Sequence, residues 1–141
     1  MKRTIFSILL ILTIPFSAFS ETKKSGNVIS QDIKSSQENL EISVNTAKTA
    51  LSKKTHVFID VREDWEYKEG HIPGIKLISL GNIEKEAQKL DKKVKYITVC
   101  AAGRRSKKAA EQMKKIGLNV VSMQGGMMKW QEKNYPVETK K

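Results

Sequence analysis

The chain has 141 residues, which is about the length of one domain. It carries 26 lysines and arginines against 15 aspartates and glutamates, a formal net charge of +11. A basic surface attracts nucleic acids, anionic lipids or small anions. The lysines are spread along the chain and often stand beside acids, so the composition argues against nucleic-acid binding. A single cysteine, Cys100, leaves no partner for an internal disulfide, so stability must come from a packed core.

The amino-terminal residues differ in composition from the rest of the chain. Residues 1–20 combine a basic start, an apolar run over residues 5–16 and small residues before position 21, which is the order of a secretory signal peptide. The run is shorter than the roughly 20 residues that span a bilayer, so we expect cleavage, with an uncleaved anchor as the alternative. Cleavage would lower the net charge to +9. We expect an exported protein, most simply in a bacterial periplasm, with no stable membrane insertion after signal cleavage.

Residues 21–39 are rich in Ser, Lys, Gln and Asn and are predicted to form a flexible polar tether. From residue 40 to residue 138, short β-branched runs alternate with helical patterns, and residues 139–141 form a tail. We predict strands over 40–42, 56–61, 75–78, 96–99 and 119–123, and helices over 44–52, 63–68, 83–90, 106–116 and after Gly125-Gly126. This alternation predicts an α/β fold with a central parallel five-stranded sheet and helices on both faces.

Cys100 directly follows a predicted strand, at the sheet edge where ligands bind in such folds. Gly103 stands where a tight loop requires a positive φ, and such a loop can turn its N–H groups inward as an anion-binding nest. The amino terminus of the next helix adds partial positive charge. Four basic side chains are expected around the site: Arg104, Arg105, Lys107 and Lys108. All of these features favour the thiolate and predict a lowered pKa for Cys100, whereas the alternative is an inert, buried cysteine.

Residues 100–106 read Cys-Ala-Ala-Gly-Arg-Arg-Ser, and this segment resembles the active-site loop of single-domain rhodaneses, Cys-x-x-Gly-x-Arg-Ser. Two further motifs extend the resemblance. Asp-Val-Arg at 60–62 precedes Gly-His-Ile-Pro-Gly at 70–74, and Gly-Gly-Met-Met-Lys-Trp stands at 125–130. The three motifs occur in the family's order and cover most of residues 40–138, so the chain resembles an exported rhodanese and is expected to adopt the rhodanese-like fold.

The resemblance implies a thiosulfate sulfurtransferase that works by covalent ping-pong catalysis. Cys100 would be the catalytic nucleophile and carry a persulfide, which cyanide or a thiol acceptor then discharges. The implied substrate-binding residues are Ala101, Ala102, Gly103, Arg104, Arg105 and Ser106. Arg105 would orient and neutralise the donor, and Ser106 would bond the loop or cap the helix. The resemblance implies no cofactor and no metal, and a persulfide carrier with little turnover of its own is the alternative.

Loop length bears on a further alternative, a phosphatase or arsenate reductase. Those related enzymes place five residues between the cysteine and an arginine, whereas four residues separate Cys100 from Arg105 here. The position that would need an arginine is occupied by Ser106. We therefore expect a ring too small for a phosphate or arsenate ion.

Three residues near the predicted site receive structural interpretations. Asp60 and Arg62 are predicted to hold each other or a neighbouring turn, and His71 is predicted to tie a loop to the sheet edge rather than to act as a base. The two histidines and one cysteine show no clustered spacing, so no metal site is expected.

Overall fold

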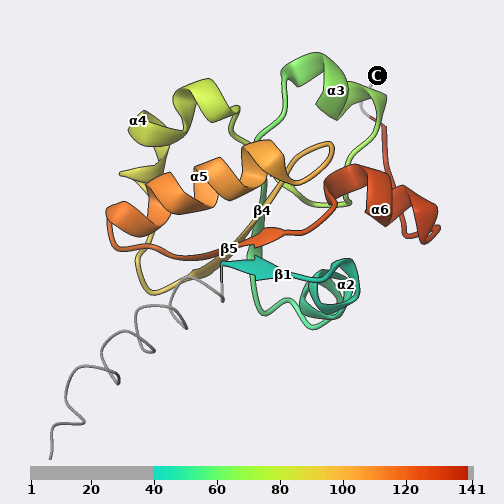
Figure 1. Ribbon diagram of the computed structural model, residues 1–141, viewed down its shortest axis with the longest axis horizontal. Helices are drawn as coiled ribbons and strands as arrows, with labels where there is room; N and C mark the ends of the chain where they lie inside the picture. Colours follow the sequence, from blue (N-terminus) through green and yellow to red (C-terminus); the bar gives the residue numbers. More distant parts are fainter. Residues whose placement is uncertain (1–39, 140–141) are drawn as a thin grey trace, which may run out of the picture.

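The computed structural model describes residues 40–139, so the predicted signal peptide and tether lie outside the described residues. Within this part of the chain, five strands form one parallel sheet in the order β1-β5-β4-β2-β3 (Figure 1). The strands are β1 (Glu41–Ile42), β2 (Val57–Asp60), β3 (Lys76–Leu77), β4 (Lys95–Val99) and β5 (Asn119–Met123). The predicted α/β class with a parallel five-stranded sheet is confirmed.

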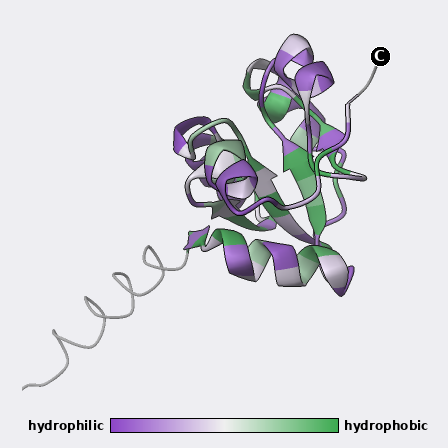
Figure 2. Ribbon diagram, turned by 90° about the vertical axis from the view of Figure 1, so that its right-hand side faces the viewer, coloured by the Kyte–Doolittle hydropathy of each residue, from purple (hydrophilic) through white to green (hydrophobic). Residues whose placement is uncertain are grey.

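Helices cover both faces of the sheet, as predicted (Figure 1). They are α2 (Val44–Ser52), α3 (Asp64–Glu69), α4 (Ile83–Ala87), α5 (Arg104–Lys115) and α6 (Gly126–Glu132), with a 3₁₀ turn η1 (Leu80–Asn82). One buried cluster joins α4 and α5 to the sheet and includes Ile59 and Met113. The other joins α2 and α6 to the opposite face and includes Phe58 and Trp130. Figure 2 shows the hydrophobic strands enclosed between helices whose outer turns are hydrophilic.

Most predicted bounds agree with the structure to within one residue, although α4 ends at Ala87 instead of residue 90. The third strand is confined to Lys76–Leu77 because its pairing with β2 covers only two residues. Helix α5 begins at Arg104, two residues earlier than predicted, because Gly103 already makes the turn with a φ of 100°. None of the helices between residues 40 and 139 combines the length and apolar character that a membrane crossing requires.

The sheet register brings the three predicted motifs to one edge. Asp60 at the end of β2 is the partner of Val99 at the end of β4, and Cys100 follows immediately. Ser122 near the end of β5 pairs with Thr98, so the Gly125-Gly126 turn also emerges at this edge. The motif residues therefore meet at the carboxyl ends of the central strands, where parallel sheets place their ligand sites.

Candidate active site

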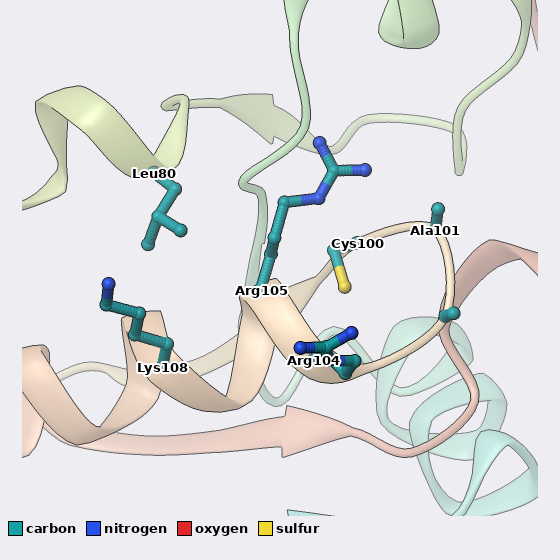
Figure 3. Close-up of a pocket in the computed structure, with 7 residues that line it drawn as sticks. Leu80, Cys100, Ala101, Arg104, Arg105 and Lys108 are labelled. Atoms are coloured by element: carbon teal, nitrogen blue, oxygen red, sulfur yellow. The ribbon is translucent and has the colours of Figure 1, made fainter.

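The loop that follows Cys100 curves around its sulfur atom (Figure 3). The backbone N–H of Gly103 donates to Cys100 Sγ at 3.1 Å, and Ser106 Oγ lies 3.4 Å from the same sulfur. The residue is only 1% exposed because the loop closes around it. The positive φ of Gly103 turns its N–H inward, as the sequence predicted.

Helix α6 holds the outside of the same loop. The N–H groups of Met127 and Met128 donate to the carbonyl oxygens of Cys100 and Ala101 at 2.8 and 3.0 Å. A Cβ atom on Gly126 would overlap both carbonyl groups, so only glycine permits this approach. Because the carbonyl oxygens are bound by α6, the N–H groups of the loop are left to face the sulfur.

A buried hydroxyl network supports the base of the loop. Ser106 Oγ donates to the Gly103 carbonyl at 2.9 Å and accepts a hydrogen bond from Ser122 Oγ at 2.9 Å. Thr98 Oγ1 donates to the Ser106 carbonyl at 2.9 Å. Ser122 and Thr98 were not predicted as site residues, since they stand within strands and belong to no motif of the sequence.

These contacts determine the acidity of Cys100. Burial by itself raises the pKa of the thiol, but its hydrogen bond with the Ser106 hydroxyl and the hydrogen bonds from the N–H groups of Ser106, Ala102 and Gly103 outweigh this effect. The pKa of Cys100 is therefore lowered from its ordinary value, as predicted. The main physical cause is hydrogen bonding within the loop. Of the basic side chains from which the sequence prediction also argued, Arg105 interacts electrostatically with Cys100.

A pocket of about 350 Å³ lies beside Cys100. It is lined by Leu80, Cys100, Ala101, Ala102, Arg104, Arg105 and Lys108. Figure 3 shows Leu80 and Lys108 on the side of the pocket opposite Ala101, with the sulfur between them. Gly103 and Ser106 support the loop from behind and are not among the lining residues. Leu80 was not predicted, because it reaches the site through the fold and not through a sequence motif.

A family model described as the rhodanese-like domain matches residues 43–133. The chain belongs to the rhodanese-like domain family.

The relatives of this rhodanese-like domain include proteins with sulfur-transfer names. YtwF of Bacillus subtilis, which carries a provisional sulfurtransferase name, is 35% identical over 68% of this chain and 94% of that protein. YrkF of the same organism, with a provisional sulfur-carrier name, is 40% identical over 64% of this chain and 50% of that protein. The thiosulfate sulfurtransferase GlpE of Pseudoalteromonas translucida is 33% identical over 64% of this chain and 87% of that protein.

Solved structures agree with the family assignment. A rhodanese-related protein from Thermoplasma volcanium has a TM-score of 0.67 and 31% identity, covering 71% of this chain and 98% of that protein. The fold predicted from the motifs is thereby confirmed as that of the family.

The four basic side chains near the loop of this rhodanese-like domain differ in their pairing. Arg105 donates from both terminal nitrogens to the two carboxylate oxygens of Glu66, each at 2.7 Å. This pairing lowers the pKa of Glu66 and raises the pKa of Arg105. Lys107 pairs with Glu41 at 3.0 Å and does not line the pocket, so its predicted place around the site was wrong.

Asp60 and Arg62 form a buried ion pair, as predicted. Arg62 donates to both carboxylate oxygens of Asp60 at 2.7–3.0 Å and to the Gly70 carbonyl at 2.7 Å. The pair fixes the segment that follows β2. Neither residue lines the Cys100 pocket.

His71 has a structural role, as predicted, but it contacts Tyr67 and Glu138 instead of the sheet edge. Its Nδ1 donates to the Tyr67 carbonyl at 2.7 Å, and its Nε2 lies 3.2 Å from a carboxylate oxygen of Glu138. Two backbone hydrogen bonds of 2.9 Å also join His71 to Glu138. His71 thus anchors the carboxy-terminal segment instead of the sheet edge. Among residues 40–139, no three His, Cys, Asp or Glu side chains cluster closely enough to hold a metal ion.

Proposed function

We propose that this protein is a sulfurtransferase that moves sulfane sulfur from thiosulfate to cyanide or a thiol through a persulfide on Cys100. The observation that carries the proposal is the Gly103 N–H at 3.1 Å from a thiol whose pKa is lowered. A thiolate is the form of cysteine that attacks electrophilic sulfur. The thiosulfate sulfurtransferase name of GlpE, a relative over 64% of this chain, supports the choice of donor.

In the first half-reaction, a sulfur atom is transferred from thiosulfate to Cys100. The Cys100 thiolate attacks the outer sulfur of thiosulfate, and a new S–S bond forms. The original S–S bond of thiosulfate breaks, and its electron pair leaves with sulfite. The product is an anionic persulfide, whose inner sulfur stays beside the inward N–H groups of the loop.

In the second half-reaction, an acceptor removes the outer sulfur of the Cys100 persulfide. Cyanide or a thiolate attacks the outer sulfur of the persulfide and takes it as thiocyanate or as a new persulfide. The electron pair of the breaking S–S bond returns to Cys100 and regenerates the thiolate. The sequence contains no other cysteine, so the acceptor must come from outside these 141 residues.

The direct test is thiocyanate formation from thiosulfate and cyanide by the purified protein. We expect ping-pong kinetics for the wild type and only background activity for Cys100→Ser, because serine cannot hold the transferred sulfur. Equal thermal unfolding of the two proteins would show that the fold is intact. Activity that survives in Cys100→Ser would overturn the proposal.

A persulfide carrier is the second candidate, and the provisional sulfur-carrier name of YrkF favours it. The near-complete enclosure of Cys100 also suits the storage of a persulfide. Loading with thiosulfate, followed by mass measurement during incubation with a small thiol, separates the two functions. Rapid discharge supports the enzyme, and slow discharge supports the carrier.

We also propose that the protein is exported, on the strength of the signal-peptide pattern over residues 1–20. Expression of the full chain in a bacterium followed by cell fractionation tests this. A periplasmic product that has lost about 20 residues supports export, and an uncleaved product in the cytoplasm contradicts it.

A further inference from the structure

The cationic side chains that line the Cys100 pocket differ in whether they pair with an acidic side chain. The two terminal nitrogens of the Arg105 guanidinium donate to the carboxylate of Glu66, and a capping hydrogen bond of 3.0 Å from the Glu63 N–H fixes that carboxylate. Glu66 is therefore the main partner of the Arg105 charge, with a smaller electrostatic contribution from Cys100 that also raises the pKa of Arg105. Between residues 40 and 139, Arg104 and Lys108 form no ion pair, although both line the pocket.

Helix geometry places these two unpaired cations together. Arg104 and Lys108 are four residues apart on α5, so they occupy the same face, and their backbones lie about 6 Å apart along the helix axis. Figure 3 shows Lys108 beside Leu80, across the pocket from Ala101. A ligand in the pocket can therefore contact Arg104 close to the sulfur and Lys108 one helical turn farther along α5.

We infer that Lys108, together with Arg104, binds the end of the donor that departs, which in thiosulfate is the sulfonate that becomes sulfite. This inference rests on the proposed function. The loop N–H groups contact the sulfur atom that stays on the protein, so they cannot also hold the leaving group. Arg105 is paired with Glu66, whereas Arg104 and Lys108 have no acidic partner among the described residues and are free to stabilise the departing anion.

The charge balance of the first half-reaction agrees with this role. When the thiosulfate S–S bond breaks, its electron pair moves onto the sulfite, and no proton is gained or lost. Negative charge therefore grows at the sulfonate end as the bond breaks, where Lys108 can stabilise it. The second half-reaction contains no sulfonate, so Lys108 should matter much less there.

The test is to measure the two half-reactions separately in Lys108→Gln. Persulfide formation from thiosulfate should be about five-fold slower than in the wild type, the effect of an exposed charge contact. Discharge of the preformed persulfide by dithiothreitol should change by less than about two-fold. With methanethiosulfonate, whose departing sulfinate carries less charge, the loss should be smaller than with thiosulfate.

Lys107→Gln is the matched control, because Lys107 is the adjacent lysine but pairs with Glu41 outside the pocket. We expect this variant to load at the wild-type rate and Lys108→Arg to regain most of the loading rate. A loading rate in Lys108→Gln equal to that of Lys107→Gln would overturn the inference. An equal slowing of loading and discharge would also overturn it, since this would indicate a structural role.

A binding measurement separates failure of this inference from failure of the proposed function. If wild-type protein gains no sulfur from thiosulfate, the proposed function fails. Calorimetric binding of thiosulfate to Cys100→Ser, with and without Lys108→Gln, still tests the anion site. An increase of about five-fold in the dissociation constant supports Lys108 as a ligand of the anion, and an unchanged constant contradicts it.

Discussion

Ser106 and Gly103 control the chemistry of Cys100 through direct hydrogen bonds to its sulfur. The Gly103 N–H is fixed by the backbone, whereas the Ser106 hydroxyl can rotate between the Gly103 carbonyl and the sulfur. Donation to the sulfur stabilises the thiolate, and burial opposes it. At this scale the net charge of the protein is secondary, because four hydrogen-bond donors close to the sulfur outweigh the cost of desolvation.

Substitution of Ser106 should raise the pKa of Cys100. Ser106→Ala removes a hydrogen bond that lowers this pKa, so a smaller fraction of the thiol is ionised at neutral pH. Alkylation by iodoacetamide measured against pH should show its midpoint at a higher pH than in the wild type. The rate lost at neutral pH should be regained as the pH rises through the new midpoint.

Ser122→Ala is a suitable comparison, since Ser122 contacts the Ser106 hydroxyl and not the sulfur. We expect a smaller movement of the alkylation midpoint in this variant. A midpoint that is the same in Ser106→Ala and the wild type would show that the Ser106 hydroxyl does not set the pKa.

At the scale of secondary-structure elements, the contact between α6 and the Cys100 loop makes the site possible. The first N–H groups of α6 bind loop carbonyls, and the glycine turn before α6 lets the two backbones approach closely. The loop is thus shaped from outside by a motif that lies more than 20 residues later in the sequence. A change in this turn should alter the sulfur environment without touching the sulfur.

Gly126→Ala should disrupt this contact. The added methyl group would overlap the carbonyls of Cys100 and Ala101, and the φ of 55° is unfavourable for alanine. We expect the free energy of unfolding to fall by about 2 kcal/mol, with loss of persulfide formation. Denaturant unfolding and loading with thiosulfate measure the two effects.

Gly81→Ala provides the control, because a Cβ atom there meets nothing within 4 Å. It should unfold and load much like the wild type. Near-normal stability and loading of Gly126→Ala would show that the close approach of α6 is not required.

Local sequence patterns predicted the bounds of individual helices and strands better than they predicted the contacts between distant side chains. The bounds of α2 and β5 agree with those predicted, because capping and β-branched patterns are encoded within each segment. The pairing of Glu66 with Arg105 spans 39 positions and has no local signal. Lys107 and Lys108 look alike in sequence, and only the packing of α5 on the sheet decides that Lys108 faces the pocket.

At the scale of the whole molecule, one sheet edge gathers three separate motifs around a single cysteine. The two buried clusters hold the strands in register, and the register brings the ends of β2, β4 and β5 together. The formal charge, +11 for the full chain and +9 after the proposed cleavage, favours the approach of small anions to this edge. Since the sequence has no second cysteine, the proposed Cys100 persulfide would be discharged by a molecule from outside these residues.

The mass of the purified protein before and after incubation with thiosulfate tests the central claim most directly. We predict that the wild type gains one sulfur atom, that cyanide removes it, and that Cys100→Ser gains nothing. The starting mass of the protein produced in a bacterium also reports whether the first 20 or so residues are cleaved. A wild-type mass that is unchanged by thiosulfate, or a sulfur adduct that persists in Cys100→Ser, would contradict the account.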